Sequence, residues 1–372
     1  MAGEILYRKI YQDLIKGISD GIYKTGSRLP SEMELAEQYG VSRITSKKAL
    51  EMLADRGLVF RQPGKGTFVT SLRPEPEEAD EEPAAPAPGK QIVIGVVFDS
   101  IGPSFGMDIL KGIEYECARR NMLMILRLTY GSIEAEKKAL RDLREAGASG
   151  VILMGAQDKS YNDEVLKLYL EKFPLVLVDR AMKGIPIPVV TTDNYRAARE
   201  LTERLIRDGH TKIGYISHSH TDTSTINARF HGFCDALHAA GIPVDGSYFE
   251  RDMDAYLPRE DDDAVSIQTY TRELSDFVDS HPDITAYFAV EFSIARLTYT
   301  VLEEKGLQNQ KALVYFDGFS GGTTPLSRRY LHVLQGQYQM GVAAIRALAH
   351  IIRGESAPDC EYVPYTVVEP EA

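Results

Sequence analysis

One stretch of 20 residues, from position 71 to position 90, constrains the fold of this 372-residue chain more than any other. It contains five prolines and six acidic side chains and no aromatic residue. Such a segment buries too little apolar surface to offset the entropy lost on folding, so it predicts a stiff, extended linker. We therefore expect a small module in residues 1–70 and a large module in residues 91–372, each with its own core.

The two modules differ in charge. Residues 1–70 contain 11 Lys and Arg against 8 Asp and Glu, a net charge of +3. Residues 91–372 contain 29 against 40, a net charge of −11. An acidic surface repels the phosphates of DNA, so any binding to nucleic acid is expected to be a local property of the first module.

Composition and cysteine content exclude several classes of protein. The 44% hydrophobic and 26% charged content is that of an ordinary globular protein. No apolar run approaches the ~20 residues that span a bilayer, and the N-terminus lacks the apolar segment of a signal peptide. Cys117, Cys234 and Cys360 lie far apart, with neither metal-ligand spacing nor a disulfide pattern, which is typical of the cytoplasm. We expect no metal and no cofactor.

The first module has the pattern of three helices and a hairpin. Apolar residues recur every four positions from Leu6 to Ile18, which predicts an amphipathic first helix. Ser31 and Glu34 have the spacing of a capping box and begin a second helix. Ser42 can cap a third helix to about Asp55. Strand-like segments at 58–62 and 67–70 flank a turn at 63–66, which completes a winged helix-turn-helix.

Such a fold places the N-terminal turn of its third helix in the major groove of DNA. Arg43 in that turn can donate two hydrogen bonds to guanine, and hydroxyl and amine side chains beside it suit phosphates or base edges. The wing tip has little bulk and one cation, which allows close approach to the DNA. The residues predicted to contact DNA on these grounds are Ser42, Arg43, Thr45, Ser46, Lys47, Lys48, Gly64 and Lys65.

The second module alternates strands with helices, which predicts an α/β architecture with parallel sheets. The module is longer than one such sheet needs, so we expect two lobes with a cleft between them. The expected strands are 92–98, 122–128, 151–154, 175–178, 189–192, 213–217, 286–290 and 313–316. The expected helices are 109–119, 133–146, 195–208, 229–240, 292–304 and 339–353.

Several stretches of the first module match a known motif. They are GIYKTGSRLPSE at 21–32, GVSRIT at 40–45, GLV at 57–59 and GKGTFV at 64–69. Through them the first module resembles the GntR family of bacterial repressors. The resemblance implies DNA contacts by Ser31, Arg43, Thr45, Lys47 and Gly64. The chain departs from the family at Met33, where many members have arginine.

The second module also matches a known family. The stretches are IGVV at 94–97, ILKGIE at 109–114, VLVDR at 176–180, VTTDN at 190–194, RFHGF at 229–233 and VYFDG at 314–318. They resemble the effector domain of the LacI/GalR family, which shares the two-lobed fold of periplasmic sugar-binding proteins. A GntR headpiece on such a domain is similar to the arabinose repressors of Gram-positive bacteria.

Ligands of open α/β sheets bind at the ends of strands, and sugar hydroxyls pair well with carboxylate, guanidinium and amide groups. The resemblance and these positions together predict an effector site. Its residues are Asp99, Ser100, Ser104, Phe105, Arg180, Arg229, Glu291 and Asp317, with Gln335 near the last crossover between lobes.

Two other classes of protein compete with this interpretation. An enzyme would need a nucleophile, phosphate-binding or zinc motif, and residues 318–322 are only a weak echo of a nucleophile elbow. A pure sugar-binding protein would not carry a DNA-binding headpiece. His218, His220 and Asp222 suggest a metal site, but without a third ligand at fixed spacing we interpret them as solvated loop residues.

The sequence therefore predicts a transcriptional regulator, a repressor of carbohydrate-utilisation genes, and not an enzyme. Its expected partners are a palindromic operator, a second copy of itself and a small sugar-like effector, with arabinose or a related sugar as the single best guess. It is expected in the cytoplasm and not at a membrane. Effector-induced release of DNA and effector-promoted binding are both compatible with the sequence.

Overall fold

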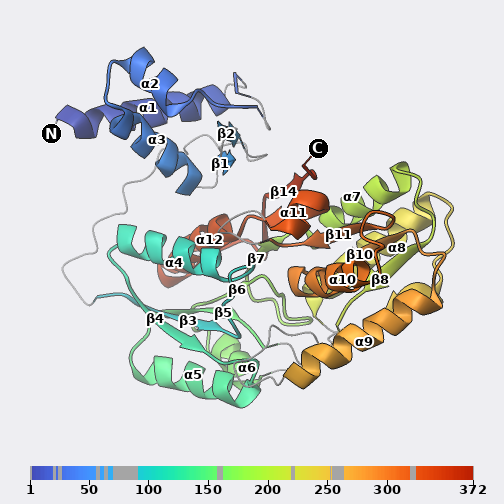
Figure 1. The fold of residues 1–372 in the computed structure, drawn as a ribbon. Coiled ribbons are helices and arrows are strands. Elements are labelled where there is room, and N and C mark those ends of the chain that lie inside the picture. The colour runs from blue at the N-terminus through green and yellow to red at the C-terminus, as the bar shows by residue number, and fades with distance from the viewer. Residues whose placement is uncertain are drawn as a thin grey trace. The chain divides into compact units, whose positions relative to one another are not determined.

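The computed structural model describes residues 2–19, 22–23, 27–55, 59–62, 66–69, 91–156, 162–218, 223–251, 253, 264–318 and 324–371. The chain forms two compact units, whose boundary in the sequence falls between Lys90 and Gln91 (Figure 1). In these described ranges, no helix combines the length and the apolar character that crossing a membrane requires.

The first unit is built from helices and a hairpin. Its elements are α1 (Ala2–Ser19), α2 (Glu32–Tyr39), α3 (Arg43–Asp55), β1 (Val59–Gln62) and β2 (Gly66–Val69). The two strands pair antiparallel. Ile10, Leu14 and Ile18 of α1 are buried in one cluster with apolar residues of α2, α3 and the hairpin. The predicted winged helix-turn-helix is confirmed, while Gly64 and Lys65 at the wing tip lie outside the described residues.

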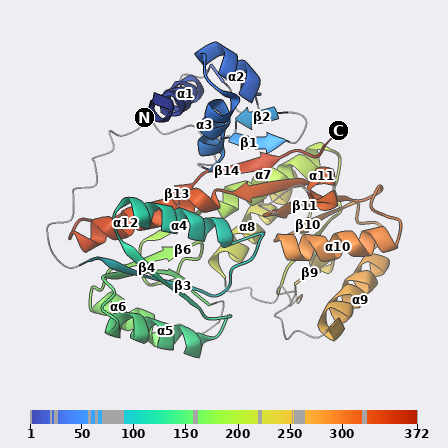
Figure 2. The same cartoon turned by 60° about the vertical axis from the view of Figure 1, so that its left-hand side comes forward.

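The first lobe of the second unit has a sheet with the strand order β13-β7-β6-β5-β3-β4. All its strand pairs run parallel. Helices α4 and α12 cover one face, and α5 and α6 the other (Figure 2). The elements are β3 (Val93–Phe98), α4 (Met107–Arg119), β4 (Leu123–Leu128), α5 (Ile133–Glu145), β5 (Gly150–Met154), α6 (Asp163–Leu170), β6 (Leu175–Val178), β7 (Val189–Thr192), α12 (Gln337–Ile352) and β13 (Cys360–Val363).

The second lobe repeats this plan with the strand order β14-β12-β11-β10-β8-β9. The pairs from β9 to β12 run parallel. The elements are α7 (Asn194–Arg207), β8 (Ile213–Ile216), α8 (Ser224–Ala239), the 3-10 helix η1 (Gly246–Tyr248), β9 (Phe249–Glu250), α9 (Ala264–Ser280), β10 (Ala286–Ala289), α10 (Phe292–Glu304), β11 (Ala312–Phe316), α11 (Pro325–Arg329), β12 (Leu331–Gln335) and β14 (Tyr365–Val368). The predicted two-lobed α/β class is confirmed.

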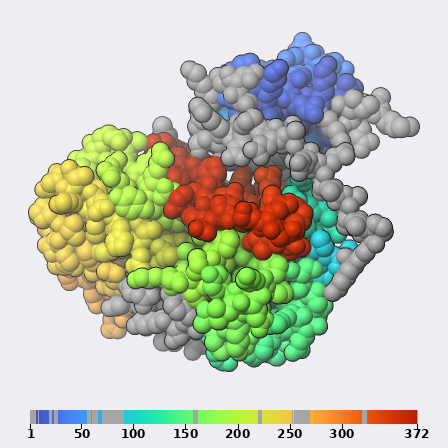
Figure 3. Space-filling model, turned by 180° about the vertical axis from the view of Figure 1, so that it is seen from behind, coloured from blue at the N-terminus to red at the C-terminus, as the bar shows by residue number. Residues whose placement is uncertain are grey.

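Among the described elements the chain passes between the lobes three times, after β7, after β12 and after β13. Helix α12 therefore follows a strand of the second lobe but packs on β5, β6 and β7 of the first. Seen from behind, the C-terminal residues lie between the yellow surface of the second lobe and the teal surface of the first (Figure 3). Any movement of one lobe against the other must bend these crossing segments.

The sequence did not predict several elements. Helices α6, α9 and α11 and strands β9, β12, β13 and β14 have no counterpart among the expected ones, and α8 begins five residues earlier than expected. Strands β9, β13 and β14 are short and mostly half-exposed. They lack the continuous apolar run that is typical of a strand buried on both faces, so their sequences do not predict strands.

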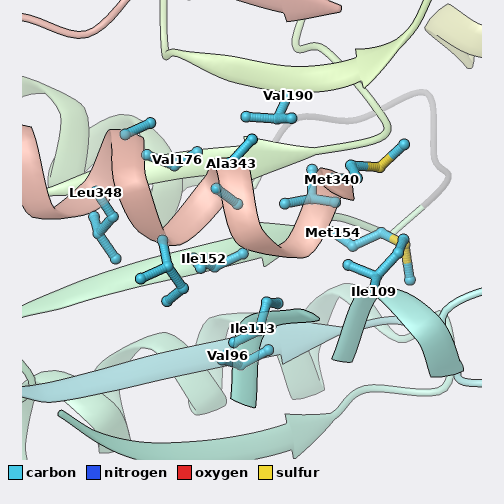
Figure 4. Packing of buried hydrophobic residues seen from close by; sticks show 14 of the residues in the cluster. Val96, Ile109, Ile113, Ile152, Met154, Val176, Val190, Met340, Ala343 and Leu348 are labelled. Atoms are coloured by element: carbon cyan, nitrogen blue, oxygen red, sulfur yellow. The ribbon is translucent and has the colours of Figure 1, made fainter. Parts of the chain in front are cut away.

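The first lobe has a buried apolar cluster on each face of its sheet, one against α5 and α6 and the other against α4 and α12. Ile113 of α4 and Ala343 and Leu348 of α12 belong to one buried cluster with Val96 and Ile152 of the sheet (Figure 4). Helix α12 thus completes the core of a lobe that lies far from it in sequence.

Helices α4 and α12 approach most closely at two glycines. A Cβ atom on Gly112 would lie 2.1 Å from the carbonyl oxygen of Tyr338, and one on Gly341 would lie 2.1 Å from that of Ile109. Backbone atoms cannot turn aside as a flexible side chain does, so a larger residue at either position forces the helices apart.

We expect Gly112→Ala to destabilise the second unit by about 1–3 kcal/mol, because overpacking of a close contact costs about that much. Gly246→Ala is the matched control, since a Cβ there meets nothing within 4 Å. Thermal unfolding of the two variants measures the difference. Equal melting temperatures for both variants and the parent protein would show that the helices tolerate a wider separation.

Candidate functional site

The capping box predicted for α2 is formed. Ser31 Oγ accepts a hydrogen bond from the Glu34 N–H at 3.3 Å, and Glu34 Oε2 accepts one from the Ser31 N–H at 2.6 Å. The bond from the Ser31 N–H to the Glu34 carboxylate lowers the pKa of that carboxyl, which favours a negative charge at the positive end of the helix. Gly40 ends α2 with a φ of +62°, a conformation that suits glycine and allows the tight turn into α3.

Glu32 joins the first turns of α2 and α3. Its Oε2 accepts a hydrogen bond from Arg43 Nε at 3.0 Å, and its backbone carbonyl accepts one from Ser46 Oγ at 2.6 Å. The Arg43 side chain remains 70% exposed. Glu32 therefore restrains the guanidinium through Nε, and the two Nη groups that suit a guanine edge are not part of that bond.

The expectation that Ser46 contacts DNA is wrong for this structure. Ser46 is fully buried, and its hydroxyl also donates to the Arg43 carbonyl at 3.0 Å. A buried hydroxyl needs hydrogen-bond partners, and the two backbone carbonyls supply them. Ser46 thus fastens α3 to α2.

The other predicted contacts of α3 lie at its surface. Ser42 Oγ accepts from the Thr45 N–H at 3.3 Å and lies 2.8 Å from Thr45 Oγ1, so it caps the helix as expected. Lys47 lies 3.6 Å from a carboxylate one turn further on, and the Lys48 ammonium lies 4.4 Å from the centre of the Tyr7 ring. We call the exposed side of the first two turns of α3 the recognition face; it carries Arg43, Ile44, Lys47 and Lys48.

In the first lobe, Arg180 connects the ends of three neighbouring strands. It follows β6, and its Nη1 donates to Asp99 Oδ2 after β3 at 2.7 Å and to the Gly155 carbonyl after β5 at 2.8 Å. Asp99 is fully buried. Ser100 Oγ donates to its other oxygen at 3.3 Å. The structure thus brings together three of the predicted effector residues.

Each lobe has a buried aspartate directly after an inner strand. Asp179 follows β6 with a φ of +67°, and Asp317 follows β11 with a φ of +71°. In both, the backbone N–H donates to the next strand at 2.8 Å, to the carbonyl of Val190 or of Val333. The left-handed conformation is uncommon for residues other than glycine, and aspartate is among those that tolerate it best. The two lobes therefore repeat one local arrangement.

Asp179 is a site residue that was not predicted. Its Oδ1 is buried and has no hydrogen-bond partner within the described part of the chain. Burial raises the pKa of the Asp179 carboxyl, while the charges of Arg180 and Arg229 oppose this effect. Buried polar atoms are normally hydrogen-bonded, so this oxygen is an open acceptor. The available signal was an Asp-Arg pair directly after an apolar strand.

Asp317 and Gln335 form the corresponding group in the second lobe. Asp317 Oδ1 accepts from Gln335 Nε2 at 2.8 Å. Burial raises the pKa of Asp317 to about 7, Arg229 and Gln335 oppose this, and the charges of Asp179 and Glu291 add to it. Gln335 Oε1 is a second buried acceptor that lacks a partner among the described residues.

Arg229 lies at the centre of the second lobe's site and is buried. Its Nε donates to Asn194 Oδ1 at 2.7 Å, and its Nη1 donates to the Val290 carbonyl at 2.6 Å. Its guanidinium carbon lies 3.9 Å from the centre of the Phe316 ring. Its positive charge also opposes the rise in pKa of Asp179 in the first lobe and Asp317 in the second. Arg229 therefore has a structural role in addition to any contact with a ligand.

Glu291 directly precedes α10. Its carboxylate accepts from Ser293 Oγ and lies 3.3 Å from His218 Nε2. His218 is buried, contrary to the expectation that it is a solvated loop residue, because it follows the inner strand β8. His220 and Asp222 lie outside the described residues, and the described ones contain no group of three side chains suited to a metal ion.

Ser104 and Phe105 lie on the loop that follows β3. Gln337, the first residue of α12, holds this loop through both ends of its amide: Oε1 accepts from the Gly106 N–H and Nε2 donates to the Ser104 carbonyl, each at 2.9 Å. Phe105 is half-buried and packs against the core of the first lobe. Gln337 was not predicted, because nothing in the sequence relates it to a loop 231 positions away.

The charged groups of the two lobes act on one another. Asp179 of the first lobe is within electrostatic reach of Arg229 and Glu291 of the second. The Ala181 N–H also donates to Ser224 Oγ across the lobes at 2.9 Å. These residues are the candidates for binding the predicted effector, and we call the set the effector site; it comprises Asp99, Asp179, Arg180, Arg229, Glu291, Asp317 and Gln335. Buried acceptors beside guanidinium donors suit a neutral molecule with many hydroxyl groups.

Each of the two units matches the model of a known protein family. Bacterial regulatory proteins of the gntR family match residues 6–69, and periplasmic binding proteins and sugar binding domains of the LacI family match residues 91–359. The arabinose metabolism transcriptional repressor of Geobacillus stearothermophilus is 25% identical over 371 residues, which cover 97% of this chain and 96% of that protein. The HTH-type transcriptional regulator RegA of Clostridium saccharobutylicum is 26% identical over 274 residues, 73% of this chain and 78% of that protein.

Solved structures share the fold of the second unit. The transcription regulator CcpA of Lactococcus lactis has a TM-score of 0.63 and 20% identity, and the match covers 75% of this chain and 98% of that one. The LacI-type match extends over more than half of the chain. The protein therefore belongs to the LacI-type family of periplasmic binding proteins and sugar binding domains, and it carries a gntR-type DNA-binding domain at its N-terminal end.

Proposed function

We propose that this protein is a transcriptional regulator that represses carbohydrate-utilisation genes under the control of a sugar bound at the effector site. One observation carries the proposal: a single chain combines an exposed Arg43, oriented by Glu32, with buried acceptors in both lobes of the second unit. Residues 1–70 bind DNA, residues 71–90 act as the linker, and residues 91–372 bind the effector and dimerise. The protein acts by binding and not by catalysis, in the cytoplasm, where its DNA lies.

The effector is a sugar, and arabinose is the first candidate because the Geobacillus relative is named for arabinose metabolism. Its hydroxyls donate to Asp179 Oδ1, Gln335 Oε1 and the Asp317 carboxylate, and they accept from Arg180. Contacts to both lobes favour one arrangement of the lobes over others. A ligand shifts such an equilibrium only as far as its affinities for the two states differ. Coupling of this kind typically changes the affinity for the other ligand, here DNA, 5- to 150-fold, which corresponds to about 1–3 kcal/mol.

The proposed DNA contact is tested on an operator selected from random duplexes with the full-length protein. Arg43→Ala is expected to weaken binding to that operator by about 1–3 kcal/mol per half-site, the value of a bidentate guanine contact. Fluorescence anisotropy at fixed salt measures this loss. Arg199→Ala, which removes a half-exposed arginine of the second lobe, is the control and should bind as the parent does. Equal affinities for both variants would contradict the assignment of Arg43.

The raised pKa of Asp317 predicts a pH-dependent affinity for arabinose. Below pH 7 its carboxyl is largely protonated and cannot accept two hydrogen bonds from hydroxyls, so affinity is expected to rise up to about tenfold per unit as pH increases toward 7, then level off. The free energy of unfolding of the ligand-free protein is expected to show the opposite trend. A raised acid pKa means that the folded state holds the proton more tightly, so stability falls as pH rises from about 4 to 7.

Calorimetric titration with arabinose between pH 5.5 and 8 measures this dependence. Asp317→Asn should bind more weakly and with a flat pH profile. Asp283→Asn is the control, because Lys212 and Tyr248 lower the pKa of the Asp283 carboxyl to about 2, outside the tested range. A rising profile that persists in Asp317→Asn would assign the titration to another group.

A homodimer is part of the proposal, and β4 supports it. This strand lies at the edge of its sheet and exposes Leu123 and Ile125, at 51% and 37%. An open strand edge with apolar side chains is a common place for association. Two copies present two recognition helices to a palindromic operator, which increases affinity through linked binding.

The double variant Leu123→Lys/Ile125→Lys should therefore be monomeric and bind the operator more weakly, because two cations placed on each copy's edge repel across the interface. Light scattering coupled to size exclusion measures the mass. Leu166→Lys, which alters a 41% exposed leucine on α6, is the control and should stay dimeric. A dimer that survives the double substitution would exclude β4 as the interface.

A further inference from the structure

Three large apolar side chains of the DNA-binding unit are at least 70% exposed, and two of them, Ile44 and Met33, lie on α3 and α2. Ile44 is 80% exposed, more than any other large apolar side chain in the described ranges, and Met33 is 70% exposed. Single exposed apolar residues are normal on protein surfaces. What distinguishes these two is their position, beside the residues that join the first turns of α2 and α3.

Each of the two follows a member of the ion pair that connects the helices. Ile44 comes directly after Arg43, and Met33 comes directly after Glu32. Arg43 Nε lies 3.0 Å from Glu32 Oε2. The bond from Ser46 to the Glu32 carbonyl holds the same two turns together. The side chains are thus carried by one rigid junction at the N-terminal ends of both helices.

The surroundings of Ile44 are cationic. Lys47 and Lys48 follow it by three and four positions, which places all three on one side of α3. Lys47 is half-exposed, and Arg43 precedes Ile44. This recognition face therefore combines phosphate-binding and base-binding groups with one apolar side chain that is not covered by the unit's own core.

The major groove of DNA has one apolar group at its base edges, the C5-methyl group of thymine. Aliphatic side chains such as isoleucine carry no donor or acceptor, and a methionine sulfur is at most a weak acceptor. Both gain free energy from excluding water against a methyl group. On the recognition face, an apolar side chain flanked by cationic ones is therefore suited to contact a thymine methyl group while the cations contact the neighbouring phosphates.

We propose that Ile44 and Met33 contact thymine methyl groups in the operator and so determine base preference at positions next to the guanine read by Arg43. The inference rests on the proposed function, because it requires that α3 enters the major groove. It adds two specificity-determining residues that read by apolar contact and not by hydrogen bonds. A protein surface is the other conceivable partner for these side chains, and the test below separates the two.

The test replaces thymine by deoxyuracil, which lacks only the C5-methyl group. Each thymine of the selected operator is changed in turn, and the full-length protein is titrated against each duplex. Removing a contacted methyl is expected to weaken binding about fourfold, the equivalent of ~0.8 kcal/mol per buried methylene-sized group. Sensitive positions are expected in both half-sites.

The variants assign these positions to residues. Ile44→Ala should abolish the deoxyuracil effect at one thymine of each half-site, and Met33→Ala at another. Ile22→Ala, which truncates a 72% exposed residue outside α2 and α3, should keep the parent profile. Each result is the ratio of the affinities of one protein sample for the thymine and the deoxyuracil duplex. A partial loss of active protein therefore does not change this ratio.

Two results would overturn the inference while leaving the proposed function intact. In one, the operator binds and depends on Arg43, but no thymine is sensitive to loss of its methyl. In the other, the sensitivity persists in both alanine variants, which would leave a protein surface as the partner of Ile44 and Met33. Failure of the proposed function looks different, since no operator is then selected at all.

Discussion

Buried carboxylates at strand ends are the constraint on which the second unit depends. An ionised carboxylate inside a protein is costly unless it is paired or hydrogen-bonded. Asp99 meets this requirement through Arg180, whose other bond reaches the end of β5. Asp317 meets it through Gln335 and the charge of Arg229. The groups that neutralise the acids thereby also hold neighbouring strand ends together.

Two buried oxygen atoms among these strand-end residues lack a hydrogen-bond partner. Asp179 Oδ1 and Gln335 Oε1 have no partner in the described structure, although both are buried. Native proteins leave few such atoms, and unpaired ones are commonly completed by water or a ligand. Both belong to residues at strand ends of the two lobes. A ligand that donates hydroxyls to both would connect the lobes where the chain itself does not.

The crossover after β12 links this site to the first lobe through consecutive residues. Gln335 bonds to Asp317 of the second lobe, and Gln337 holds the loop of Ser104 in the first. Gly336 between them carries no side chain. A change in the angle between the lobes must therefore pass through a short segment whose two ends are fixed to different lobes. In the first unit Glu32 has a similar linking role, because it holds Arg43 with its side chain and Ser46 with its carbonyl.

The sequence by itself determined the two units, the winged helix-turn-helix and the α/β class, because these depend on local signals. Capping boxes, apolar periodicity and a proline-rich acidic segment act within a few residues. It also placed Asp99, Arg180 and Asp317 just after strands and Arg229 on a helix. Only the tertiary structure decided their partners. Ser46 is buried by α2, Asp179 is left with an open acceptor, and Gln337 reaches a loop 231 positions away. Burial and pairing arise from the packing of distant segments, and no local pattern encodes which segments meet.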